Sequence, residues 1–170
     1  REAPVAWLVA FPHAPIEQRT TEYEKACILY NTAAQITRVS MQLNRSDSST
    51  DALKRAYTGL RQAAGLLQYI KNNFLYAPSD DMKGPALESL SKLLLAQASE
   101  VFLEKSIHDT KGEALIAKLA SHTAHTYSGL SVEWNDTVNL GVPAMWCRIL
   151  ACMADQFRCV GELYRANGDR

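Results

Sequence analysis

Residues 50–73 of this 170-residue chain read TDALKRAYTGLRQAAGLLQYIKNN. Apolar side chains recur in this stretch at intervals of three and four residues, which is the period of an amphipathic α-helix. They are Leu53, Ala56, Tyr57, Leu60, Ala63, Ala64, Leu67 and Ile70. The pattern therefore predicts a helix over the whole stretch, with one buried face. The small residues at 63–65 further predict that another helix packs closely there, because Gly65 in a helix interior costs about 1 kcal/mol relative to alanine.

Helical patterns continue on both sides of this stretch. The apolar spacing predicts helices over residues 21–43, 85–107 and 111–130, and a last helix that starts between residues 135 and 143 and ends near Ala166. Short polar turns separate them. Four or five long helices joined in this way predict antiparallel hairpins that stack into an all-α solenoid resembling tetratricopeptide arrays, although the sequence signature of that repeat is absent.

The start of the chain has a different character. Residues 5–11, VAWLVAF, are short, apolar and partly β-branched, which predicts a strand. Thr21 followed by Glu24 is a capping-box pattern that predicts the beginning of the first helix. Because the chain opens with Arg1 directly in apolar sequence, we expect residues 1–170 to be one domain piece taken from a longer protein.

Composition excludes several classes of function. The chain has 18 basic and 18 acidic side chains and a formal net charge of zero. A nucleic-acid-binding domain or a polybasic membrane tether would need a basic excess, so neither is expected. A hydrophobic content of 47% argues against a disordered segment. No apolar run reaches the roughly 18 residues that a membrane-spanning helix requires.

The sequence offers little for catalysis. It contains no phosphate-binding loop, no dinucleotide-binding fingerprint, no nucleophile elbow and no C-x-x-C pair. Cys147, Cys152 and Cys159 share the last predicted helix, but spacings of five and seven residues do not gather three thiolates around a metal. We expect them to be small buried apolar residues. The sequence thus predicts no enzyme activity, no cofactor and no metal site.

One apolar feature lies apart from the predicted core. Leu115 and Leu119 are neighbours on one helix but lie well round from its main apolar stripe. Phe102 occupies the preceding antiparallel helix, close enough to the connecting turn to meet them. Three lysines would flank this patch: Lys105, Lys111 and Lys118. An apolar patch with a charged rim is typical of a surface that receives an amphipathic partner helix. The pattern alone leaves a second interpretation open, namely contact with another helix of the solenoid.

Several segments together resemble a known family. Residues 23–34, YEKACILYNTAA, are similar to the "[FY]EKxxVLFNxAAL" helix of the Bro-one domain, which ALIX, its fungal counterparts and the PalA/Rim-twenty proteins share. Residues 63–70 resemble its "AAGxFxYL" stretch and residues 77–81 its "PSxDL" loop. Residues 94–102, LLAQASEVF, resemble "LMLAQAQEVF", and residues 116–120 match "IAKLA". The order of the five segments is the same in both.

The resemblance implies a curved helical body and a protein-interaction function. In the family, the domain binds the C-terminal amphipathic helix of the filament-forming ESCRT-III subunit (the Snf-seven or Vps-thirty-two type). Aligned by motif, the binding patch falls on Phe102, Leu115 and Leu119, with a polar contact at Lys54. These three apolar residues are also those of the offset patch, so the resemblance favours the partner-binding interpretation, with Lys118 on the rim.

The implied setting is a cytoplasmic adaptor that is recruited to endosomes for multivesicular-body sorting. Two alternatives remain: a fungal ambient-pH signalling scaffold that uses the same ESCRT-III contact, and a curved module that binds membranes directly. Zero net charge argues against the second, so membrane association is expected to be indirect. The family's domain is longer than this chain, which resembles its central part, with a strand at 5–11 and helices over 21–166.

Overall fold

The computed structural model describes residues 5–7, 16–18, 20–43, 50–74, 79–136 and 144–168. Five long helices dominate these segments and are α1 (Thr21–Gln42), α2 (Thr50–Asn73), α3 (Gly84–His108), α4 (Glu113–Asp136) and α5 (Ala144–Gly168). A single 3-10 turn, η1 (Asp80–Met82), precedes α3. The all-α prediction is confirmed. The predicted helix bounds agree to within a few residues except in α4, which continues past the predicted end at residue 130.

A two-stranded antiparallel sheet lies near the start of the chain. Strand β1 (Val5–Trp7) pairs with β2 (Ile16–Gln18), with Val5 opposite Gln18 and Trp7 opposite Ile16. The predicted strand at 5–11 is therefore confirmed for its first three residues, and residues 8–11 lie outside the described segments. The partner strand β2 was not predicted.

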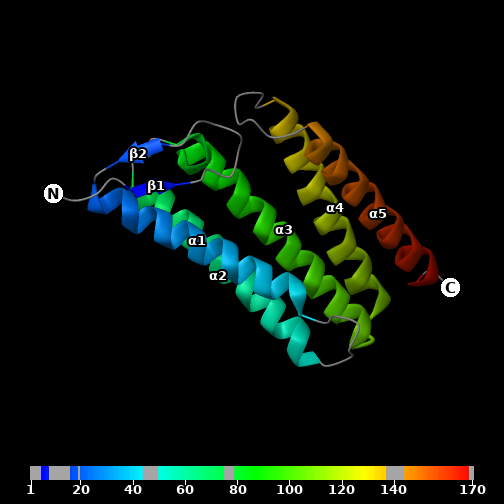
Figure 1. Cartoon of the computed structure of the whole chain (residues 1–170). Helices are drawn as coiled ribbons and strands as arrows, with labels where there is room; N and C mark the ends of the chain where they lie inside the picture. Colours follow the sequence, from blue (N-terminus) through cyan, green and yellow to red (C-terminus); the bar gives the residue numbers. More distant parts are fainter. Residues whose placement is uncertain are drawn as a thin grey trace.

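The five helices form a row in sequence order. Among the described segments, extensive helix–helix contacts join only consecutive helices: α1 with α2, α2 with α3, α3 with α4, and α4 with α5. Figure 1 shows α1 and α2 at one end of this row and α5 at the other. Contacts restricted to neighbours are the defining property of a solenoid. The predicted stacking of antiparallel hairpins is confirmed.

Helix α3 lies in the middle and separates two apolar cores. The first core is built by α1, α2, η1 and α3 and includes Tyr23, Leu60, Ile70, Met82 and Val101. The second is built by α3, α4 and α5 and includes Leu103, Ile116, Tyr127, Trp134 and Phe157. Val101 and Leu103 thus face different cores, although only one residue separates them. Phe102 lies between them and is 43% exposed.

The contact of α2 with Ser40 of α1 depends on Gly59. A Cβ atom built on Gly59 would lie 2.1 Å from Ser40 Oγ, so only glycine leaves room for the serine hydroxyl. Ser40 Oγ donates a hydrogen bond to the Ile36 carbonyl in its own helix (2.8 Å), so the hydroxyl needs no partner on α2.

The predicted close packing of another helix over 63–65 is confirmed at Ala63 and Ala64, which are buried, and α3 approaches there through the hydrogen bond from Ser91 Oγ to the Ala64 carbonyl (3.2 Å). It is wrong at Gly65, which is exposed and where an added Cβ would meet no other part of the molecule within 4 Å.

Two further expectations are corrected at the helix ends and on α5. The N-cap of α1 is Thr20 rather than Thr21, and its side chain makes no capping hydrogen bond. Cys152 and Cys159 are exposed and Cys147 is half-buried, so they are not the predicted small buried residues. The physical reason is the position of α5 at the end of the row, where it packs extensively on α4 alone among the described helices.

We expect Gly59→Ala to lower the free energy of unfolding by about 1–3 kcal/mol, the usual cost of overpacking. Gly65→Ala is the matched control on the same helix. It should raise the free energy of unfolding by up to about 1 kcal/mol, because alanine favours helix and space is open there. Adding Ser40→Ala to Gly59→Ala should restore stability. Urea unfolding followed by circular dichroism measures all three, and equal stabilisation by both glycine substitutions would contradict the close contact.

Adjacent residues of α3 should differ sharply in their contribution to stability. Leu103 is 2% exposed in the second core, so Leu103→Ala should cost about 2–5 kcal/mol. Phe102→Ala removes only a half-exposed ring with one aromatic neighbour and should cost less than about 1.5 kcal/mol. Thermal unfolding of the two variants tests the described orientation of α3, which a larger loss at Phe102 would refute.

Candidate functional site

Phe102 is held in its exposed position by an aromatic residue of α2. The ring of Tyr57 lies 5.8 Å from the ring of Phe102, centroid to centroid, with the two planes tilted by 41°. Tyr57 is itself half-buried and packs against the first core. Tilted ring pairs at this distance are favourable. An outward-facing phenylalanine with one supported face can therefore present its other face to a partner.

Leu115 and Leu119 lie on α4, the next helix of the row. Leu115 is 47% exposed, whereas Leu119 is half-buried and packs against the second core. Helices α3 and α4 are joined by a four-residue turn and are tied further along by the Tyr127 hydroxyl, which donates to Glu100 (2.8 Å). Counted from the ends of the two helices at this turn, Phe102 and Leu119 each lie six residues away, and Leu115 lies about one helical turn nearer the connection than Leu119. Phe102, Leu115 and Leu119 are called the apolar patch below.

The turn that joins the two helices of the apolar patch is fixed by polar contacts. Thr110 adopts a left-handed backbone (φ 50°), and the amide of Lys111 donates to the Ser106 carbonyl (3.0 Å). Lys105 forms an ion pair with Asp109 in the last turn of α3. The hydrogen bond from Lys105 holds the pKa of the Asp109 carboxyl below its usual range. The positive charge that the sequence predicts at Lys105 on the rim is thus paired with Asp109 at this turn.

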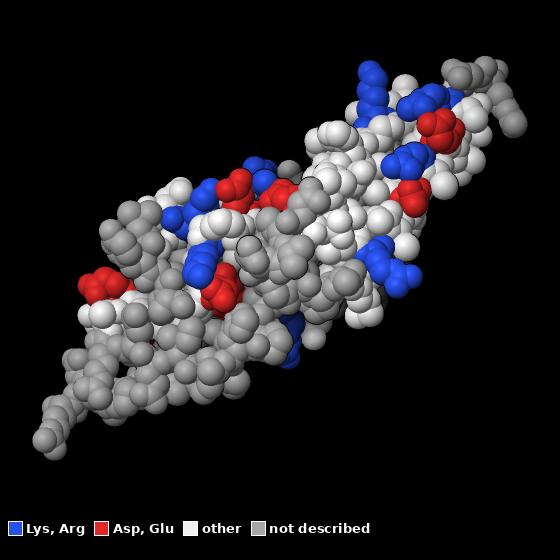
Figure 2. Space-filling view, turned by 90° about the horizontal axis from the view of Figure 1, so that it is seen from above, with Lys and Arg blue, Asp and Glu red and all other residues white. Residues whose placement is uncertain are grey.

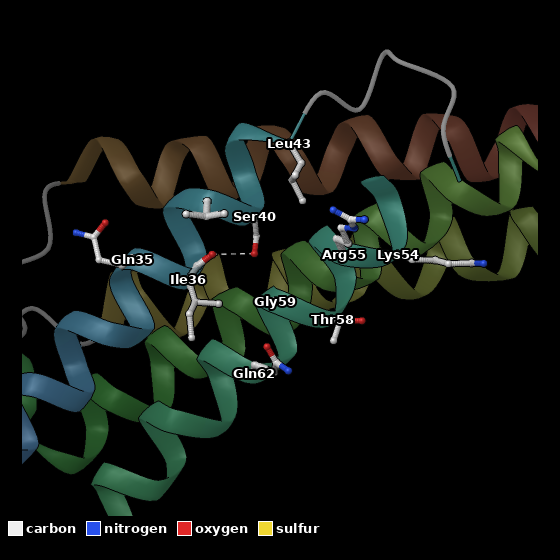
Figure 3. Close-up of a pocket in the computed structure, with 10 residues that line it drawn as sticks. Gln35, Ile36, Ser40, Leu43, Lys54, Arg55, Thr58, Gly59 and Gln62 are labelled. Atoms are coloured by element: carbon white, nitrogen blue, oxygen red, sulfur yellow. Dashed lines mark hydrogen bonds between the residues drawn. The ribbon is translucent and has the colours of Figure 1, made fainter. Parts of the chain in front are cut away.

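Lys54 lies at the beginning of α2 beside a groove between α1 and α2. The groove encloses about 620 Å³, and its apolar lining includes Ile36, Val39 and Leu43. Figure 3 shows Lys54 at one end of the groove with its amine pointing away from Ile36. The Lys54 side chain is exposed and precedes Tyr57 by one helical turn. The structure therefore places Lys54 near the Tyr57–Phe102 pair along α2.

Lys118 lies on the other side of α4. It is exposed and lines a groove of about 380 Å³ between α4 and α5, together with Ser121, Tyr164 and Arg165. Lys54 and Lys118 therefore come from helices that α3 separates, and the structure does not bring them together.

Sequence reasoning missed two residues beside the apolar patch. The predicted core stripe includes Tyr57, and its packing against the first core confirms this, but its contact with Phe102 and the position of Arg61 are not predicted. In the structure the Arg61 guanidinium lies over the Tyr57 ring at 5.4 Å from its centroid and donates to the Tyr57 hydroxyl (3.1 Å). The spacing of four residues between a tyrosine and an arginine on one helix is the only signal that could have indicated this contact.

The site has no features of a metal or catalytic centre within the described segments. Their His, Cys, Asp and Glu residues form no group of three that could hold a metal ion. None of the described helices combines the length and hydropathy needed to cross a bilayer. On the described part of the face in Figure 2, Lys and Arg alternate with Asp and Glu rather than forming an area of one sign. The exposed faces of Phe102 and Leu115 can contact an apolar surface of a partner.

The chain is similar in sequence to known proteins over nearly its whole length. The chain is 36% identical over 163 residues to the vacuolar protein-sorting protein bro1 of Aspergillus fumigatus, which covers 96% of the chain and 16% of that relative. It is 30% identical over 166 residues to rhophilin-2-B of Xenopus laevis, covering 94% of the chain and 24% of the relative. The chain therefore spans only a small part of the curated relatives that it matches.

Solved structures and a family model show the same relationship. The complex of the ALIX BRO1 domain with CHMP4C superposes with a TM-score of 0.86 at 25% identity, covering 96% of the chain and 48% of that structure. ALIX bound to the SIVmac239 PYKEVTEDL late domain gives a TM-score of 0.81 at 26% identity, covering 89% of the chain and 22% of that structure. The model of the BRO1-like domain matches residues 1–170. The chain therefore belongs to the BRO1-like domain family.

Proposed function

We propose that this chain is a protein-interaction module that binds the C-terminal amphipathic helix of a filament-forming ESCRT-III subunit. The observation that carries the proposal is the exposure of Phe102 and Leu115 on adjacent helices of a BRO1-like domain. The solved complex of the ALIX BRO1 domain with CHMP4C supports the choice of partner. The patch would receive the apolar side chains of that helix.

Binding at this patch would be driven by burial of apolar surface. A fully buried leucine or phenylalanine contributes about 1.5–3 kcal/mol relative to an exposed one. Phe102 and Leu115 are already about half covered, so each would contribute roughly half of this value. Ordering a short partner helix offsets part of the gain. Affinity in the micromolar range, about 8 kcal/mol, is the expectation for one short helix, so Phe102 and Leu115 would supply only part of the binding free energy.

Lys54 and Lys118 would act at the margins of the interface. Both are exposed, Lys54 on α2 and Lys118 on α4. Exposed cations at a rim mainly accelerate association with an acidic partner, and salt screens their contribution. They would therefore affect the rate of binding more than the lifetime of the complex.

The cellular role proposed for the parent protein is recruitment to endosomes for multivesicular-body sorting. Fungal relatives that are vacuolar protein-sorting proteins support sorting as the process. The ESCRT-III contact would bring the adaptor to the endosome from the cytoplasm. Direct membrane binding is less well supported, since the described part of the face in Figure 2 mixes both signs of charge, whereas anionic lipid attracts clustered cations.

We expect Leu115→Asp to weaken binding of a fluorescently labelled CHMP4C C-terminal helix peptide by at least about tenfold, or 1.4 kcal/mol. The added carboxylate would have to lose its hydration inside an apolar contact. Val132→Asp is the matched control, because Val132 is 60% exposed on the same helix and lies about 25 Å along it from Leu115. Fluorescence polarisation measures both affinities after circular dichroism has shown equal helicity.

The control should bind like the original chain. Equal binding by both variants would place the peptide elsewhere and refute the residue assignment. Absence of binding by the folded original chain would refute the proposal for these 170 residues, and a longer chain that includes the flanking parts of the domain would then test whether additional helices complete the site.

A further inference from the structure

Arg61, Tyr57 and Phe102 form a continuous series of contacts between α2 and α3. The guanidinium of Arg61 covers the Tyr57 ring at 5.4 Å, and the Tyr57 ring contacts that of Phe102 at 5.8 Å. A hydrogen bond from Arg61 Nη1 to the Tyr57 hydroxyl (3.1 Å) adds a second contact between the first two residues. Arg61 is exposed, whereas Tyr57 is half-buried. The Tyr57 ring therefore contacts both the charged guanidinium of Arg61 and the apolar ring of Phe102.

Arg61 differs from two other cations of α2 and α3 in the group that it contacts. Arg55 pairs with Asp51 (2.7 Å) and Lys105 pairs with Asp109, each on its own helix. Within the described segments, no carboxylate forms an ion pair with Arg61. Its guanidinium is instead positioned by the ring and hydroxyl of Tyr57. Such an arginine keeps its capacity for a bidentate contact with a carboxylate while losing little side-chain freedom on binding.

The spacing between the Arg61 guanidinium and the Phe102 ring suits a helical ligand. The Arg61 guanidinium lies 5.4 Å and the Phe102 ring 5.8 Å from the centroid of the Tyr57 ring, so the two groups are at most about 11 Å apart. Two turns of a partner helix, about 11 Å, are enough to cover both groups. A helix that places an apolar side chain on Phe102 can therefore place an acidic side chain on Arg61.

We propose that Arg61, positioned by Tyr57, selects partner helices that carry a carboxylate within two turns of the apolar side chain seated on Phe102. This inference rests on the proposed function and adds Tyr57 and Arg61 of α2 to the partner-binding surface. Arg61 touches the partner directly, and Tyr57 is a positioning residue that orients both Arg61 and Phe102. The resulting preference is for acidic amphipathic helices over neutral ones.

The test uses the labelled CHMP4C helix peptide and a neutralised version in which every Glu and Asp is replaced by Gln and Asn. Arg61→Gln should weaken binding of the acidic peptide by about two- to fivefold at low salt, the range for an exposed ion pair. The same substitution should leave binding of the neutralised peptide unchanged. Arg55→Gln is the matched control, because Arg55 is an exposed arginine of the same helix that is already paired with Asp51.

Salt dependence and a second variant separate the positioning role of Tyr57 from the effect of the charge on Arg61. The effect of Arg61→Gln should fade between about 0.05 M and 0.5 M salt as screening increases. Tyr57→Leu keeps an apolar side chain but removes the ring, so it should weaken binding of both peptides, and Arg61→Gln should add little further loss in its presence. Circular dichroism of each variant confirms that the helices are intact.

The outcomes distinguish this inference from the proposed function. Binding that depends on Leu115 but is unaffected by Arg61→Gln, or is affected equally by Arg55→Gln, overturns the role of Arg61 alone. An equal loss for the acidic and the neutralised peptide also overturns it. Absence of binding by the folded original chain overturns both proposals.

Discussion

Burial of α3 on two sides is the constraint on which the candidate site depends. Val101 faces the core shared with α1 and α2, and Leu103 faces the core shared with α4 and α5. A helix that satisfies both cores has little surface left, and Phe102 occupies part of it. The outward direction of Phe102 is thus a consequence of packing. Any rotation of α3 that hid this ring would withdraw a buried residue from one of the cores.

Contacts at both ends of α3 keep its neighbours in register. At one end, Lys71 of α2 contacts Glu88 of α3 (2.6 Å), and Lys92 of α3 contacts Glu133 of α4 (2.9 Å). Hydrogen bonds from Lys71 and Lys92 hold the pKa of Glu88 below its usual range. Partly exposed ion pairs contribute little stability each, so their main effect here is on alignment. At the other end, the Tyr57–Phe102 contact and the short turn after α3 complete the alignment.

Apolar periodicity was sufficient to predict the five helices and their order, because each helix buries a face with the 3.6-residue period. It could not predict which neighbour covers a given face. Gly59 and Gly65 lie on the same helix, but only Gly59 meets Ser40. In the candidate site, the predicted exposure of Phe102 and Leu115 agrees with the structure, whereas Tyr57 has the spacing of a core residue. Its contact with Phe102 arises between two helices and leaves no trace in either sequence pattern.

The support that Tyr57 gives to Phe102 explains how a half-exposed ring can act as an anchor. A free phenylalanine on a helix surface would lose rotamer freedom on binding and so reduce the affinity that its burial contributes. Here one face of the ring already contacts Tyr57, and the flanking residues of α3 are fixed in two cores. Much of the ordering cost has therefore been met during folding. A solenoid makes this arrangement natural, because each helix is positioned by its neighbours and leaves a surface stripe free for partners.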